Sequence, residues 1–186
     1  MVHPFLWVSE SSRTRVFWVL FALAVALMVI LQFLGAPLKT SAAPAGIVSF
    51  ELAGNAAQSQ RILGSWDAGA RAYAGLNLGL DYLFIVSYVG AIGLGCSLLA
   101  GNLRKRIRSL FYVGVTLAWA QFLAAAFDSL ENIALLRLLL GSRQAAWSVI
   151  ARACAIPKFM IVLLGLLYIV VALVISLAGR PAHQDR

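Results

Sequence analysis

The 186-residue chain is about the length of one domain, but 62% of its residues are hydrophobic and only 12% are charged. A mean hydropathy of +0.89 excludes an ordinary soluble domain, because so few charged groups cannot cover a surface that faces water. The formal net charge of +8 does not indicate nucleic-acid binding, since the basic residues form short groups between apolar runs. We expect these groups to set membrane topology and to contact lipid headgroups.

Four apolar runs predict an all-α fold, an integral membrane four-helix bundle that forms a single membrane domain over residues 1–186. A hydrocarbon core about 30 Å thick takes roughly 20 helical residues to cross, and lipid offers no hydrogen bonds to an open strand edge. The expected helices cover about 16–34, 76–100, 109–139 and 158–179. The first run is longer than the apolar core of a secretory signal, about 7–15 residues, so we expect an uncleaved helix.

The first loop, 35–75, has two parts. Proline and small residues predict an irregular linker in the first part, whereas residues 47–66 predict an extracytoplasmic interfacial helix or a helical cap over the bundle. Trp66 is expected at the level of the lipid headgroups, which indole rings favour. Asp67 and Arg71, four residues apart on a helix, are expected to form a solvated ion pair.

The second helix carries an acid inside its apolar run. Asp81 lies about two turns from one end, with Asn77 one turn nearer that end and Tyr88 seven residues further on along the same face. A charge at this depth is costly without a partner, so Asp81 is expected to face the bundle interior. Close packing against a neighbouring helix is predicted by small residues at every fourth position, Ser87, Ala91 and Gly95.

The loop at 101–109 holds the densest basic group of the chain, Arg104, Lys105, Arg106 and Arg108. Because cytoplasmic loops carry the excess of lysine and arginine, this loop is predicted to be cytoplasmic. With four spans both termini are then cytoplasmic, consistent with Arg13 and Arg15 at one end and Arg180 and Arg186 at the other. A composition rich in alanine, leucine, glycine and arginine favours a bacterial inner membrane.

The third helix brings three polar side chains to one face. If the third helix enters the membrane from the cytoplasm near Ser109, about 20 residues at 1.5 Å each bring it to the opposite membrane surface near Asp128. Glu131 and Asn132 follow at i+3 and i+4, so the three share a face. Gln121 precedes Asp128 by seven residues on that face, where its amide either bonds across a helix interface or contacts a ligand.

The last loop, 141–158, predicts a second short interfacial helix. Pro157 is well placed near the start of the fourth helix, which begins at Lys158. Three helices thus bring acids and a lysine to a similar depth. The capping segment can add one of three further polar residues, Glu51, Asn55 or Arg61. The predicted ligand-binding residues are Asp81, Asp128, Glu131, Asn132, Lys158, Asn77, Tyr88 and Gln121.

Two interpretations of this polar group stay open. It is either a binding or proton-handling pocket that opens toward the outside, or an ion-pair and hydrogen-bond cluster that fixes the register of the helices. No metal site and no cofactor are expected. The only histidines, His3 and His183, lie in the tails, and Cys96 and Cys154 belong to no CxxC pair.

Three functions are compatible with the sequence. The first is a binding protein or transporter component that takes a lipid-like or small ligand into the outward-facing pocket. The second is a membrane enzyme that acts on a lipid-like substrate, with Asp81 or Glu131 as general acid or base and Lys158 as the polarising group. The third is a structural or assembly subunit of a membrane complex. The expected partners are membrane lipids, such a ligand and other membrane subunits, and nucleic acid is not among them.

Overall fold

The computed structural model describes residues 2–178, and within this range the chain is helical, without a strand. Its long helices are α1 (Glu10–Gly35), α4 (Ala68–Leu103), α5 (Arg108–Leu139) and α6 (Ala145–Ala178), and each is long and apolar enough to cross a membrane. This confirms the predicted all-α class and the four helices of membrane-crossing length. The tail residues Arg180, His183 and Arg186 lie outside the described residues.

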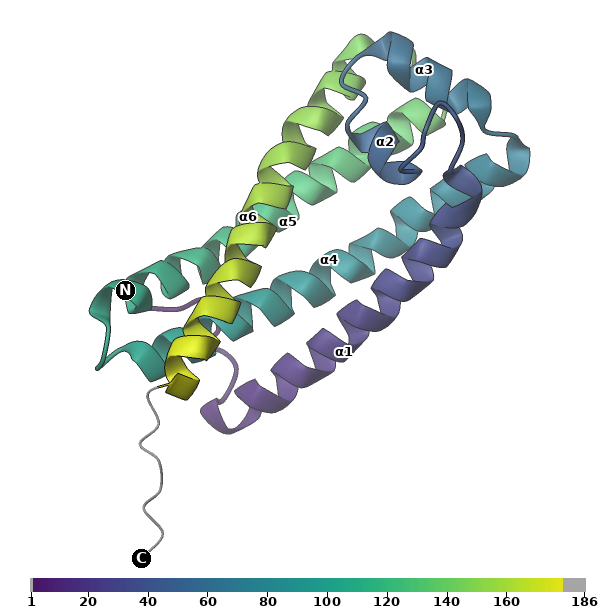
Figure 1. The fold of residues 1–186 in the computed structure, drawn as a ribbon. Coiled ribbons are helices and arrows are strands. Elements are labelled where there is room, and N and C mark those ends of the chain that lie inside the picture. Colours follow the sequence, from purple (N-terminus) through teal and green to yellow (C-terminus); the bar gives the residue numbers. More distant parts are fainter. Residues whose placement is uncertain (1, 179–186) are drawn as a thin grey trace, which may run out of the picture.

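Residues 36–66 fold over one end of the long helices, and we call this segment the cap (Figure 1). Its helical parts are η1 (Ala36–Leu38), α2 (Ile47–Glu51) and α3 (Ala56–Ser65). Gly54, with φ at +71°, makes the turn between α2 and α3, a backbone conformation that L side chains rarely adopt. Asn55 then caps α3, its side-chain oxygen accepting a hydrogen bond from the Gln58 amide at 2.8 Å.

Two predictions about the end of the cap and the start of α4 are wrong. Trp66 does not lie among lipid headgroups: it is only 2% exposed, packs against the Phe50 ring and donates its indole N–H to the Leu38 carbonyl at 2.9 Å. Asp67 and Arg71 are not paired, because both bond the backbone instead. The Asp67 carboxylate caps α4 at the Ala70 amide, and Arg71 donates to a carbonyl of α3.

Helix α4 is the centre of the bundle and packs against α1, α5 and α6. Residues 87–97 are all buried, so this stretch has no exposed side. Its glycines explain how neighbours approach from several directions: a Cβ on Gly90 would lie 2.5 Å from Leu20, and one on Gly93 would lie 2.7 Å from Phe5. The small residues predicted to pack closely, Ser87, Ala91 and Gly95, are all buried.

The segment before α1 folds back onto the bundle. Phe5 is 3% exposed and inserts between α4 and α5, with its ring 5.8 Å from that of Phe122. Trp119 of α5 donates its indole N–H to the Val2 carbonyl at 2.9 Å. The start of the described chain is therefore held by helices that come much later in the sequence.

Helix α6 begins thirteen residues before the predicted start, at Ala145 rather than at residue 158. Pro157 therefore lies inside the helix, and its predicted place near the helix start is wrong. The early turns are stabilised by the cap: Ala151 is buried in the cap core, and the hydroxyl of Ser148 hydrogen bonds to that of Ser59 at 2.8 Å. Polar residues along one side made this amphipathic segment resemble a separate interfacial helix.

Candidate functional site

Lys158 of α6 lies at the centre of a buried ion-pair cluster under the cap. Its ammonium nitrogen is 2.7 Å from a carboxylate oxygen of Glu131, 3.0 Å from one of Asp128 and 3.9 Å from one of Glu51. These four residues, from α2, α5 and α6, form what we call the Lys158 cluster. All four side chains are at least 88% buried, so the charges compensate one another within a largely dehydrated environment.

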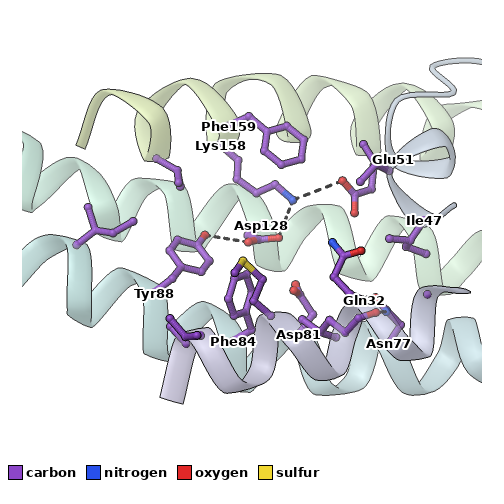
Figure 2. Close-up of a pocket in the computed structure, with 18 of the residues that line it drawn as sticks. Gln32, Ile47, Glu51, Asn77, Asp81, Phe84, Tyr88, Asp128, Lys158 and Phe159 are labelled. Atoms are coloured by element: carbon purple, nitrogen blue, oxygen red, sulfur yellow. Dashed lines mark hydrogen bonds and ion pairs between the residues drawn. The ribbon is translucent and has the colours of Figure 1, made fainter. Parts of the chain in front are cut away.

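Helix α4 contributes two further contacts next to this cluster. The Tyr88 hydroxyl donates to Asp128 at 2.8 Å, so both Asp128 oxygens have a partner, Tyr88 on one and Lys158 on the other. Asn132 donates from its amide to Asp81 at 2.6 Å. The residues predicted from separate helices, Asp81, Asp128, Glu131, Asn132, Lys158 and Tyr88, thus lie in one region at the cap end (Figure 2).

A cavity of about 560 Å³ adjoins the Lys158 cluster, within the range typical of small-ligand sites. Residues of α1, α4 and α6 line most of it, and we call it the α1–α6 cavity after the two helices between which it opens. Glu51, Asp81, Asp128 and Lys158 are exposed to it at the cap end, as Figure 2 shows. Away from that end the wall is apolar, lined by Phe21, Ala24, Val25, Met28, Ile92, Val162 and Leu166.

The cavity is open on the side between α1 and α6. Helix α1 packs mainly on α4 and buries only Leu27 fully, whereas α6 packs on α5 and α4. Lining residues on both rims are exposed, Val25 by 41% on α1 and Phe159 by 42% on α6. If the four helices cross a bilayer, this opening faces lipid directly.

Two predicted site residues bond to helix backbone. Gln121 is fully buried at the contact between α5 and α6, donates to the Ile161 carbonyl at 3.3 Å and does not line the cavity. Asn77 lines the cavity, but its amide donates to the Leu31 carbonyl of α1 at 3.1 Å. Of the three cap residues considered, Glu51 joins the cluster, Asn55 caps α3, and Arg61 is exposed.

Sequence reasoning missed Gln32 and Phe159 at the cavity. Gln32 is the one amide in the apolar run of α1, and Figure 2 shows it directed toward the carboxylates. That isolation was a usable signal, since a lone amide in a membrane segment usually has a polar partner or a functional role. Phe159 follows Lys158 in sequence, and its ring centroid lies 4.6 Å from the ammonium nitrogen. Phenylalanine is common in apolar helices, so nothing in the sequence indicated that Phe159 lines a cavity.

Acidic groups outnumber the basic ones in and around the cavity. The carboxylates are those of Glu51, Asp81, Asp128 and Glu131, and the amines are those of Lys158 and, at the cap side, the exposed Lys39. The Glu51 oxygen that lies 3.9 Å from the Lys158 nitrogen is buried and has no hydrogen-bond partner, and burial raises the pKa of its carboxyl above the usual 4.5, opposed by the neighbouring Lys158 charge. Glu51 is therefore the most weakly paired of the three acids around Lys158.

No protein-family model, curated protein or solved structure matches this chain. Its function is therefore inferred from the geometry of the site.

Proposed function

We propose that this protein is a multi-pass membrane protein that binds an amphipathic, lipid-like molecule in the α1–α6 cavity. The polar end of that molecule would lie at the Lys158 cluster and Asp81, and its apolar part would follow the wall toward Phe21 and Leu166. The observation that carries this proposal is the shape of one continuous cavity, charged at one end, apolar along its length and open between two membrane-crossing helices. A water-soluble ligand would leave the long apolar wall unused.

The polar groups divide into two roles under this proposal. Glu131 is fully buried and does not line the cavity, so its contact with Lys158 fixes the register of α5 against α6. Asp81 and Glu51 do line it and serve the ligand. An assembly subunit would need the first role alone, and the cavity favours a binding protein or transporter component over it. A catalytic role has no such supporting feature.

Filling the cavity is expected to remove the bound molecule. The Val25→Trp protein, purified in mild detergent, should lose a lipid-like species that co-purifies with the unchanged protein and is identified by native mass spectrometry of the complex. Val19→Trp is the matched control, because Val19 is exposed on another face of the same helix and does not line the cavity. Equal occupancy in both variants, or no bound species in the unchanged protein, would contradict the proposal.

We further propose that the cap lies outside the cell membrane and that the loop with Arg104, Lys105, Arg106 and Arg108 is cytoplasmic, as basic-residue density favours. A cysteine at Gln60, exposed on α3, should react with a membrane-impermeant maleimide in intact cells. A cysteine at Lys105 should react only after permeabilisation. The native Cys96 and Cys154 are buried, which keeps the background low. Labelling of position 105 in intact cells would reverse the orientation.

A further inference from the structure

We infer that the polar end of the ligand is a cation, a protonated amine or a quaternary ammonium, without an accompanying anionic group. This inference rests on the proposed function, since it names the chemical class of the molecule in the α1–α6 cavity. At the cap end of the cavity, Lys158 is already paired with carboxylates, whereas the carboxylates are incompletely paired with cations.

Among residues 2–178, Lys158 is the one buried cation in the site, and it is not available to an anionic ligand. Lys158 already has carboxylate oxygens of Glu131, Asp128 and Glu51 within 3.9 Å, two of them at 3.0 Å or less. A phosphate or carboxylate that approached it would meet these carboxylates at short range. Repulsion between like charges in a dehydrated site would outweigh the attraction of one shared ammonium.

The acceptors, in contrast, are in excess. Glu51 lines the cavity, and its oxygen nearest to Lys158 is 3.9 Å away and has no hydrogen-bond partner, so Glu51 is only weakly paired. Asp81 is half-buried on the opposite wall, with one oxygen bonded by Asn132. Three carboxylates line the cavity, those of Glu51, Asp81 and Asp128, against the amines of Lys158 and the exposed Lys39. Lys158 is also paired with the buried Glu131, so a ligand cation would reduce the net negative charge instead of increasing it.

Aromatic rings complete a cation site. Phe84 and Tyr88 lie side by side on the α4 wall, with centroids 5.2 Å apart, and Phe159 lies on the α6 wall. Phe159 already has the ammonium of Lys158 near its ring. The face of an aromatic ring attracts ammonium groups, and cages of rings with carboxylates recognise quaternary ammonium. Figure 2 shows Phe84 and Phe159 on opposite sides of the carboxylates.

The test uses three probes with one hexadecyl chain and different polar ends: hexadecyltrimethylammonium, hexadecanol and hexadecyl phosphate. Binding to the full-length protein in non-ionic detergent is measured by native mass spectrometry. The ammonium probe should bind at least about tenfold more tightly than the alcohol, the scale of one hydrogen-bonded or stacked charge, and the phosphate should bind most weakly.

Variants locate the effect. Asp81→Asn keeps an acceptor oxygen for Asn132 and should lower ammonium affinity about tenfold without changing that for the alcohol. Glu51→Gln should act in the same direction, which guards against misfolding of either variant. Glu10→Gln, an exposed carboxylate at the start of α1, should change nothing.

The outcomes separate the two proposals. Equal binding of all three probes, lost in Val25→Trp, would overturn the cationic headgroup and leave the lipid-binding function intact. Tightest binding of the phosphate would overturn it by making Lys158 an anion site. If no probe binds above the level of the Val25→Trp protein, the proposed function itself is wrong.

Discussion

Replacing Lys158 with methionine is expected to lower the free energy of unfolding by about 3–5 kcal/mol, the usual cost of removing one partner from a buried ion pair. The variant would leave Glu131, Asp128 and Glu51 close together under the cap with no cation among them. These acids would then have to take up protons or move apart. Moving apart would separate α5 from α6, and α2 from both of these helices. Thermal unfolding of the detergent-solubilised protein, followed by size-exclusion chromatography, measures the loss.

Two variants show whether the loss comes from charge. Lys105→Met removes an exposed lysine at the opposite end of the bundle and should leave the unfolding temperature unchanged. Adding Asp128→Asn and Glu131→Gln to Lys158→Met removes the unbalanced acids and should restore much of the stability, since a fully neutral buried set costs little. A Lys158→Met protein as stable as the unchanged one would mean that the ion pairs do not hold the helices together.

Gly114→Val is expected to destabilise the bundle by about 1–3 kcal/mol or more, the cost of adding carbon to a filled core. A Cβ at Gly114 of α5 would collide with the hydroxyl of Tyr168 and lie 2.8 Å from the Cβ of Ala100. The Tyr168 hydroxyl is fixed there because it donates to the Leu110 carbonyl at 3.0 Å. The side chain must leave that position, and α5 must separate from α4 and α6. Detergent-resistance and thermal unfolding assays measure this change.

Gly79→Val is the matched control for this substitution. Gly79 also lies inside a long helix, α4, but a Cβ there would meet no atom within 4 Å. Its variant should unfold at the same temperature as the unchanged protein, within about 0.5 kcal/mol, the usual range for surface substitutions. Valine has a higher helix propensity than glycine, so equal losses in both variants would mean that the contacts of Gly114 with Tyr168 and Ala100 do not control the outcome.

The convergence of Asp128, Glu131 and Lys158 could be anticipated because it depends on helical spacing and on a count of depth, both of which a sequence contains. The spacing of Asn132, four residues after Asp128, likewise placed it on the same helix face, and there its amide bonds Asp81. Tyr88 shares a helix face with Asp81, yet its hydroxyl bonds Asp128 of α5, since the choice between two nearby acids depends on the approach of α4 to α5.

Glu51 and the apolar wall could not be assigned from the sequence with the same argument. Glu51 reaches Lys158 only because the turn at Gly54 and the buried Trp66 fold the cap back over the helices. Helix α1 is apolar on every side, so nothing in its pattern separates the face with Val25, which lines the cavity, from the face with Val19, which does not.

The insertion of Phe5 between α4 and α5 also constrains the order of assembly during synthesis. Residues 2–9 emerge from the ribosome long before Gly93, Trp119 and Phe122, the groups that receive them. At a typical 5–20 residues per second, this segment waits several seconds before the residues that it packs against are made. Residues 2–9 are therefore made before these helices but reach their native positions only after them.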